Sequence, residues 1–256
     1  MVAVLVQGAS RGLGLQFVRA LAARDSVGAV VATCRQPEQA DELRALPKVH
    51  VLPLDVTNEA SVRAAAAQVS RSVAGLDLLI NCSAMLHPSG RGETSLRDVS
   101  AEGLEKTFMT NTFGPLLVAK HFAPLLQKGS GALGVQSTDP KQKHASILVN
   151  MTAKVGSIGE NILGGWYSYR MSKAALNMAT KNLSIELGRG RNKVLCVGLH
   201  PGTVDTDLSR PYHKNVPKDQ LFSTQKSVDC LLSIVDKLAV VDTGKVFVWS
   251  GDPLPF

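Results

Sequence analysis

The sequence predicts an α/β fold, a single domain built on a doubly wound parallel sheet with helices on both faces. Short apolar runs alternate along the chain with longer segments of helical periodicity. The apolar runs show no polar alternation, which is typical of strands buried on both faces of a parallel sheet. A length of 256 residues is sufficient for one such domain with a sizeable core.

Seven apolar runs are predicted to be strands, and the segments between them supply the helices. We expect strands over residues 2–6, 29–33, 49–54, 76–80, 147–151, 194–199 and 246–249. We expect helices over residues 15–23, 37–46, 60–73, 101–127, 169–187 and 227–238. In the first helix, Leu15, Val18 and Leu21 should face the sheet.

Three segments lie outside this alternation. Residues 128–144 are rich in Gly, Gln, Lys, Ser and Pro, and we expect a mobile surface insertion there. Residues 207–223, which contain Pro211 and Pro217, have mixed polarity and are expected to form a substrate lid. Residues 253–256 are expected to pack on the surface or on a partner chain.

Composition and charge narrow the function classes. The net charge of +7 comes from dispersed basic residues without an aromatic-basic patch, so we expect no nucleic-acid partner. No apolar run is long enough to span a bilayer. The first strand begins at Val2, which leaves no room for a targeting peptide, so the expected location is the cytoplasm. The scattered cysteines indicate free thiols rather than a metal site: Cys34, Cys82, Cys196 and Cys230.

A glycine-rich loop follows the first predicted strand directly. It has the spacing G-x-x-x-G-x-G over residues 8–14, rather than the G-x-G-x-x-G of long dinucleotide folds. Glycines at this place allow the backbone to approach a phosphate closely at the start of a helix. The binding residues expected here are Gly8, Ser10, Arg11, Gly12, Leu13 and Gly14.

Tyr169 and Lys173 lie four residues apart in the predicted helix 169–187, so their side chains share one face. A phenol titrates near pKa ~10, and a neighbouring ammonium favours the phenolate. We therefore expect Lys173 to lower the pKa of Tyr169 toward neutrality. Such a phenol would serve as a proton donor or acceptor.

The glycine loop and the Tyr169-x-x-x-Lys173 pattern, in this order and separation, resemble the short-chain dehydrogenase/reductase family. The resemblance covers essentially the whole chain and is closest to the carbonyl-reductase branch that includes the C-factor and sniffer proteins. It implies a Rossmann-like fold, a nicotinamide coenzyme, and roles for Tyr169 and Lys173 in catalysis and in coenzyme binding. The family often pairs its long helices into homodimers or homotetramers, and the sequence leaves this chain's oligomeric state open.

Two segments at strand ends carry further parts of the resemblance. Asp55, followed by Val56, stands after the third predicted strand, where the family places an aspartate against the adenine. Pro-Gly-x-Val-x-Thr over residues 201–206 resembles the family turn that packs on the nicotinamide and reaches the pyrophosphate. The resemblance therefore assigns the coenzyme site Asp55, Val56, Pro201, Gly202, Val204 and Thr206.

Two asparagines complete the resemblance. Residues 81–84 read Asn-Cys-Ser-Ala, a degenerate form of the family's Asn-Asn-Ala-Gly. We interpret Asn81 mainly as a tie between neighbouring strands, and place its backbone and Ser83 at the coenzyme. Asn111 lies inside the predicted helix 101–127, where asparagine needs compensation. In the family, an asparagine at this place bends the helix and holds a water that links the lysine to solvent.

The end of the second predicted strand bears on the choice of coenzyme. An acidic residue there favours the free 2′-hydroxyl of NAD(H), whereas an arginine accommodates the 2′-phosphate of NADP(H). The chain has Cys34 and Arg35 at this place, and Arg11 in the glycine loop is a second cation. We therefore expect NADP(H). The alternative is that Arg35 caps a loop and Arg11 faces solvent.

The chain departs from the family after the fifth predicted strand. In the family, the sequence at the end of this strand contains Ser-Ser, and the second serine binds the substrate carbonyl. This chain has Ala153 at that position. Two hydroxyls could substitute, that of Thr152, which would have to turn inward, and that of Ser157, which lies twelve residues before Tyr169. The sequence does not decide between them.

The combined expectation is an NADPH-dependent reductase of a small-molecule ketone, aldehyde or quinone, with Tyr169 as the general acid. The catalytic group would comprise Tyr169, Lys173, Asn111, and Thr152 or Ser157. Ala153 motivates an alternative, an NADP(H)-binding regulatory protein with weak or no turnover, because loss of one oxyanion donor costs about 10²- to 10³-fold in rate. Trp166 is left open between core and pocket wall, and His87 is interpreted as a loop residue.

Overall fold

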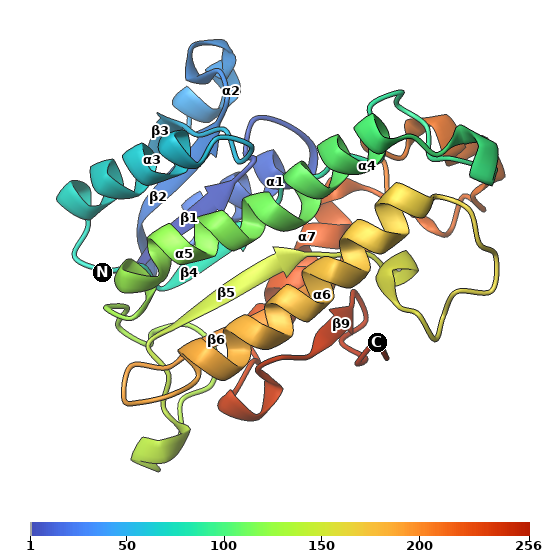
Figure 1. The fold of residues 1–256 in the computed structure, drawn as a ribbon. Coiled ribbons are helices and arrows are strands. Elements are labelled where there is room, and N and C mark those ends of the chain that lie inside the picture. Colours follow the sequence, from blue (N-terminus) through green and yellow to red (C-terminus); the bar gives the residue numbers. More distant parts are fainter. Residues whose placement is uncertain (1) are drawn as a thin grey trace.

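The structure, a computed structural model, describes residues 2–256 and contains a seven-stranded, fully parallel sheet (Figure 1). The strands stand in the order β3-β2-β1-β4-β5-β6-β9. Their bounds are β1 Val2–Gln7, β2 Val27–Cys34, β3 Val49–Pro53, β4 Leu78–Asn81, β5 Ser146–Met151, β6 Val194–His200 and β9 Val246–Val248. Each contains or overlaps a predicted run, and the doubly wound α/β prediction is confirmed.

Helices cover both faces of the sheet (Figure 1). Their bounds are α1 Gly12–Ala22, α2 Asp41–Arg44, α3 Glu59–Ser72, α4 Ala101–Phe108, α5 Gly114–Leu126, α6 Tyr167–Leu187 and α7 Thr224–Val235. The alternating residues of β1 show how the two cores arise. Val4 and Val6 pack in one core with residues of α1 and α7, whereas Leu5 packs in the other with residues of α3, α5 and α6. Leu15, Val18 and Leu21 are buried in the first of these cores, as predicted.

Two predicted helices are shorter or interrupted. The segment 37–46 contains a 3₁₀ turn at Pro37–Gln39 and the single helical turn α2, because the backbone at Ala40 leaves the helical region. The segment 101–127 is divided into α4 and α5 by a π-helical turn at Met109–Phe113. Pro115 has no N–H to donate to the carbonyl four residues earlier, so the regular ladder cannot run through this place.

The segment 128–144 is attached to the rest of the protein at Leu133 and Val135. Leu133 is buried in the core beside α7, and the main-chain N–H of Val135 donates to the carbonyl of Leu238 at 2.8 Å. The buried imidazole of His144 lies 2.8 Å from the Leu133 carbonyl. The predicted insertion is therefore anchored by an apolar and a polar contact.

The C-terminal segment folds back on β9 of its own chain. Phe247 pairs antiparallel with Pro253, and the N–H of Leu254 donates to the Val246 carbonyl at 2.7 Å. Leu254 is buried, whereas Phe256 remains exposed. Of the two placements expected for residues 253–256, the surface of the same chain is the one observed.

Nothing among residues 2–256 forms a helix with the length and apolar character that crossing a membrane requires. A short two-stranded parallel ribbon, β7 Thr203–Val204 and β8 Leu221–Phe222, encloses most of residues 207–223. We call residues 207–223 the lid segment. The strand order reverses between β1 and β4, which is where a doubly wound sheet opens a crevice at the carboxyl ends of its strands.

Candidate active site

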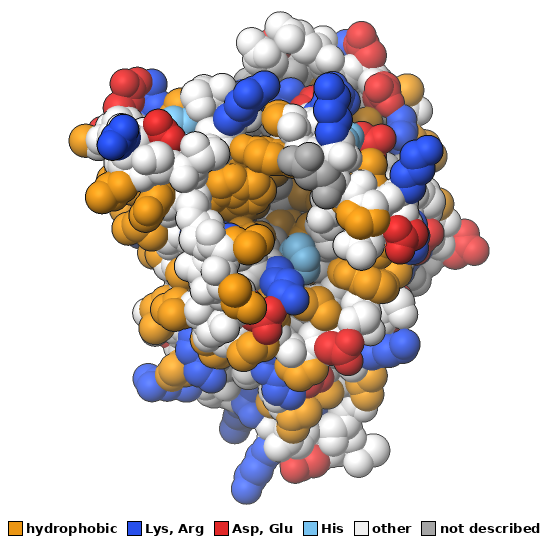
Figure 2. Space-filling model, turned by 90° about the vertical axis from the view of Figure 1, so that its right-hand side faces the viewer, with side chains coloured by type: hydrophobic (Ala, Val, Ile, Leu, Met, Phe, Trp, Pro, Cys, Tyr) orange, Lys and Arg blue, Asp and Glu red, His pale blue; other side chains and the backbone are white. Residues whose placement is uncertain are grey.

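A cavity of about 700 Å³ lies at the carboxyl ends of the strands. Figure 2 shows this edge of the molecule face-on, where the surface is hollowed and hydrophobic side chains border the hollow. Most of the predicted site residues line the cavity: Gly8, Ser10, Arg11, Gly12, Leu13, Gly14, Arg35, Asp55, Val56, Ser83, Thr152, Tyr169, Lys173, Pro201, Gly202, Val204 and Thr206. Asn81, Asn111 and Ser157 are not among its lining residues.

The glycine loop turns tightly between β1 and α1. The N–H groups of Gly8 and Ala9 both donate to the Thr33 carbonyl, at 3.0 and 2.9 Å. Gly8 has a φ of 81°, and a methyl group on it would stand 2.6 Å from the Ser83 nitrogen. A methyl group on Gly14 would overlap the Gly8 carbonyl oxygen. Only glycine fits these two places.

The N-terminus of α1 opens at this cavity. Arg11 occupies the N-cap position in extended conformation, and no side chain caps the first N–H groups of the helix. Uncapped N–H groups and the positive end of the helix dipole favour an anion. The first turn of α1 is therefore suited to bind a phosphate.

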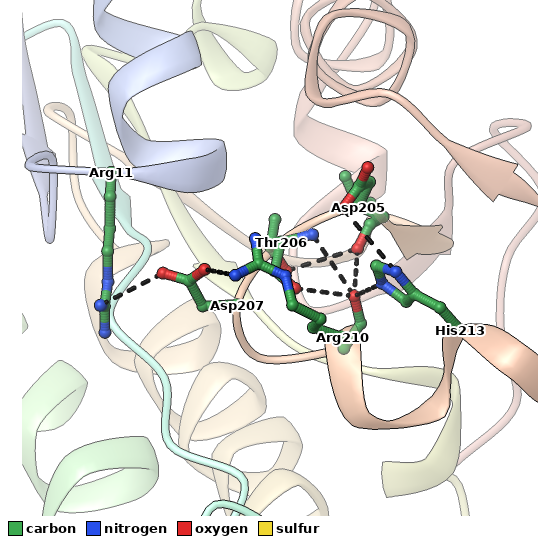
Figure 3. A network of polar contacts seen from close by, with 8 residues as sticks. Arg11, Asp205, Thr206, Asp207, Arg210 and His213 are labelled. Carbon is green, nitrogen blue, oxygen red and sulfur yellow. Dashed lines mark hydrogen bonds and ion pairs between the residues drawn. The ribbon is translucent and has the colours of Figure 1, made fainter.

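Two arginines stand near this end of the cavity. Arg35 is exposed at the end of β2, and none of the ion pairs among residues 2–256 involves it. Arg11 pairs with Asp207 of the lid segment at 3.3 Å, and Asp207 also pairs with Arg210 at 2.9 Å. Figure 3 shows Asp207 between the two guanidinium groups.

Asp55 and Thr57 shape the wall after β3. The main-chain N–H and the hydroxyl of Thr57 both donate to one oxygen of Asp55, at 2.9 and 2.7 Å. This local turn leaves the half-buried Asp55 at the border of the cavity. The carboxylate is therefore held in place before any ligand contacts it.

Tyr169 and Lys173 reach the cavity from the first turns of α6. Both side chains are buried, at 7% and 1% exposure. The Lys173 Nζ donates to the carbonyl of Met151, the last residue of β5, at 2.8 Å and lies 5.7 Å from the centre of the Tyr169 ring. The helical spacing thus brings the phenol and the amine to one wall, as the sequence predicts.

The prediction that Lys173 lowers the pKa of Tyr169 is wrong for this structure. Burial raises the pKa of Tyr169 above its ordinary value, and burial lowers the pKa of Lys173 to about 8. Desolvation disfavours the charged form of each group. With the amine bonded to a carbonyl and 5.7 Å from the ring, desolvation is the larger effect, and Tyr169 keeps its proton.

Asn111 holds the loop after β4 against α6. The side chain is fully buried in the π-helical turn. Its Oδ1 accepts from the Met85 N–H at 2.8 Å, and its Nδ2 donates to the Met85 carbonyl and to the Ser172 hydroxyl, at 2.7 and 3.0 Å. These bonds compensate the asparagine inside the helical segment and join it to the residue preceding Lys173.

Asn81 ties β4 to its neighbours, in agreement with the sequence interpretation. Its Nδ2 donates to Oδ1 of Asn150 on β5 at 2.8 Å and to the Pro115 carbonyl at 3.4 Å. Asn150 in turn donates to the Thr180 hydroxyl on α6 at 2.9 Å. A buried chain of polar side chains thus runs from β4 through β5 to α6.

Of the two candidate hydroxyls, one is bonded to α6 and the other lies away from the cavity. Thr152 borders the cavity, but its hydroxyl donates to Oδ1 of Asn177 on α6 at 2.7 Å. Ser157 is buried outside the cavity lining and accepts from the Glu160 N–H at 3.3 Å. Ala153 itself lines the cavity.

The model of the short chain dehydrogenase family matches residues 2–217. The chain belongs to this family. An NADPH-bound carbonyl reductase from chicken fatty liver superposes with a TM-score of 0.86 at 32% identity, covering 99% of this chain and 98% of the other. The carbonyl reductase Sniffer of Drosophila melanogaster gives 0.86 at 30% identity, with all of both chains covered.

A curated relative agrees with this assignment. An uncharacterised oxidoreductase of Schizosaccharomyces pombe is 31% identical, covering 98% of this chain and 96% of the relative. The chain is therefore an oxidoreductase of the short-chain dehydrogenase family, whose members use nicotinamide coenzymes. The tight glycine loop, the uncapped N-terminus of α1 and the cavity at the strand reversal fit such a coenzyme.

In this short-chain dehydrogenase, an apolar cluster forms the wall beside Tyr169. Leu86, Ala153 and Tyr169 are buried together, and partly buried side chains that include Trp166 and Tyr212 pack against them. The Trp166 and Tyr212 rings lie 4.7 Å apart. Trp166 is thus packed behind the pocket, since it does not itself line the cavity.

Three residues near this wall escaped the sequence interpretation. The buried Glu93 carboxylate accepts from the N–H and the hydroxyl of Ser168 at the start of α6, and so caps the helix that carries Tyr169. The Tyr212 hydroxyl accepts from the Gly92 N–H at 2.8 Å. His200 lines the cavity at the end of β6. Each stands alone in a loop or at a strand end, where no periodic pattern signals its contacts.

His87 also lines the cavity, and its Nδ1 lies 2.8 Å from the hydroxyl of Ser89 in the same loop. This contact fits the interpretation of His87 as a loop residue.

Proposed function

We propose that this short-chain dehydrogenase is an NADPH-dependent carbonyl reductase that converts a ketone, aldehyde or quinone to an alcohol with Tyr169 as the general acid. The observation that carries the proposal is the buried Tyr169–Lys173 pair on the cavity into which the glycine loop and α1 open. The names of the chicken and Drosophila carbonyl reductases, at 32% and 30% identity, support the reaction class.

The chemistry divides between coenzyme and chain. A bound reduced nicotinamide supplies a hydride to the carbonyl carbon. The oxygen then needs a proton, and the burial that raises the pKa of Tyr169 keeps a proton on its hydroxyl for that transfer. Lys173, whose pKa burial lowers to about 8, is charged in a large part of its population at neutral pH. Its ammonium would stabilise the phenolate left behind and assist its reprotonation.

The preference for NADPH rests on Arg11 and Arg35. Both line the cavity on the side of the glycine loop and the end of β2, and neither β2 nor the residue after it offers a carboxylate for the 2′-hydroxyl of NADH. A guanidinium forms bidentate bonds to phosphate. Arg35, which makes no ion pair among residues 2–256, is available for the 2′-phosphate.

The test is a coenzyme-oxidation assay of the purified protein across quinones, aldehydes and ketones. Y169F should reduce turnover of every accepted carbonyl by at least about 10²-fold while leaving NADPH affinity nearly unchanged, because only the proton donor is removed. Y167F is the matched control, since Tyr167 lies two residues earlier on α6 and does not line the cavity. Retained turnover in Y169F would exclude Tyr169 as the acid.

A second candidate function is an NADP(H)-binding regulatory protein with weak or no turnover. The observation that favours it is the β5 wall of the cavity, where Ala153 carries no hydroxyl and the Thr152 hydroxyl is bonded to Asn177. The same assay separates the two candidates. Tight NADPH binding without oxidation by any carbonyl would support the regulator.

A further inference from the structure

His200 is the last residue of β6 and stands directly before Pro201. It lies beside the end of β5, because the Thr152 N–H donates to the Leu199 carbonyl at 2.9 Å. Its half-buried ring borders the same cavity as Tyr169 and Ala153. The ends of β5 and β6 thus place an imidazole on the wall where the reacting carbonyl would lie.

No other side chain of this wall offers a free hydrogen-bonding group for a carbonyl. The cavity residues at the ends of β5 and β6 are Met151, Thr152, Ala153, His200 and Pro201. The Thr152 hydroxyl is directed at Asn177, and Met151, Ala153 and Pro201 have no hydrogen-bonding group suited to a carbonyl. Within this set, His200 alone offers a polar group that no described residue engages.

The imidazole has unused hydrogen-bonding capacity. Its Nδ1 is buried without a partner among the described residues. Leaving a buried polar atom unpaired costs about 1–3 kcal/mol, and such an atom calls for an explanation. Burial and the nearby Lys154 charge lower the pKa of His200 to about 4. Because Nδ1 is closed off by the protein, the group that can donate to a ligand in the cavity is Nε2–H, which bonds to no described residue. The neutral ring adds no charge beside the nicotinamide.

We propose that His200 is a catalytic residue that donates a hydrogen bond to the substrate carbonyl oxygen, so that the oxygen is held between the imidazole and the Tyr169 hydroxyl. This inference rests on the proposed carbonyl reductase function. The hydride adds to the carbonyl carbon, the proton of Tyr169 goes to the oxygen, and His200 keeps its own proton throughout. A second donor at the oxygen stabilises the negative charge that develops there.

The test combines H200A with A153S. H200A should lower kcat/KM for an accepted carbonyl by about 10²-fold, the size expected for one oxyanion donor, while NADPH affinity stays within about twofold. A153S places a hydroxyl on the same wall. In the H200A background, A153S should raise kcat/KM by at least about tenfold, because the two donors serve the same oxygen. H50N, which alters an exposed histidine on β3, is the control.

The outcomes separate this inference from the proposed function. If H200A keeps kcat and KM within about threefold of the wild type while Y169F is inactive, the inference is overturned and the carbonyl reductase stands. If H200A loses activity together with NADPH affinity or thermal stability, and A153S restores nothing, His200 has a structural role and the inference is again overturned. Wild-type protein that reduces no carbonyl in the panel overturns both.

Discussion

The Arg11 guanidinium lies 3.3 Å from the Asp207 carboxylate, so that an ion pair joins the glycine loop to the lid segment (Figure 3). Asp207 also pairs with Arg210 within the lid segment at 2.9 Å. The Thr206 side chain lies close by, 3.4 Å from the position that a methyl group on Gly12 would take. The carboxylate therefore competes with a coenzyme 2′-phosphate for Arg11.

Neutralising Asp207 should strengthen the binding of NADPH. The Arg11 and Asp207 side chains are 75% and 50% exposed, and an ion pair this exposed contributes no more than about 1 kcal/mol. D207N should therefore lower the Kd for NADPH by about two- to fivefold and leave that for NADH unchanged, as measured by fluorescence titration. D219N makes the same charge change elsewhere in the lid segment and should leave both affinities unchanged. Equal shifts for both coenzymes would show that Arg11 does not contact the 2′-phosphate.

A methyl group at Gly14 should damage both the fold and the coenzyme site. It would overlap the Gly8 carbonyl oxygen and stand 3.0 Å from the Ala9 Cα, so α1 and the glycine loop would have to separate. We expect G14A to lose about 1–3 kcal/mol of unfolding free energy and at least about tenfold in coenzyme affinity. Urea unfolding and coenzyme titration measure the two effects.

Gly159 provides the control for that substitution. A methyl group there would meet only the Phe256 oxygen, at 3.5 Å, which is an ordinary contact. G159A should therefore keep wild-type stability and affinity. A G14A protein that matched it in both measurements would contradict the close packing of the glycine loop against α1.

Acidification should destabilise the protein partly through His200. Its pKa falls from 6.5 to about 4 on folding, so the unfolded chain binds more protons between these values and stability decreases as the pH falls through this range. The full effect is about 3 kcal/mol. H200N should remove this part of the decrease, as measured by urea unfolding at pH 7 and pH 4. The buried His144, whose pKa burial also lowers, contributes equally in both proteins.

The exposed His50 supplies the comparison for this pH dependence. H50N should follow the wild-type curve between pH 7 and pH 4. If H200N and wild type lose the same free energy of unfolding on acidification, the imidazole of His200 is not held neutral by the fold.

The fold was predictable because its signals are local. Val2–Val6 is an uninterrupted apolar run, and the glycine spacing after it specifies a turn that admits no side chain at Gly8 or Gly14. The asparagine in the segment 101–127 marked the place where the helix changes, but not the form of the change. A π-helical turn depends on bonds from Asn111 to Met85 and Ser172, which are distant in the sequence.

The chemistry of the site was less predictable, because it depends on packing. The four-residue spacing correctly predicted that Tyr169 lies near Lys173. The sign of the Tyr169 pKa shift depends on burial, which the spacing alone does not reveal. The direction of the Thr152 hydroxyl is set by Asn177, 25 positions further along. His200 carries no periodic signal and becomes visible only when β5 and β6 are side by side.

The contact between Trp166 and Tyr212 has a kinetic consequence. The centres of the two rings lie 4.7 Å apart, and the Tyr212 hydroxyl accepts a hydrogen bond from the Gly92 N–H. These contacts hold the lid segment against the loops that contain Gly92 and Trp166. Separating these loops breaks one ring contact and one hydrogen bond, which together stabilise the closed arrangement by about 1–3 kcal/mol. For a bulky molecule that has to part these loops to pass, a barrier component of this size slows passage in either direction by about five- to 150-fold. The contact would therefore set how fast such a molecule exchanges with the pocket and would leave its affinity unchanged.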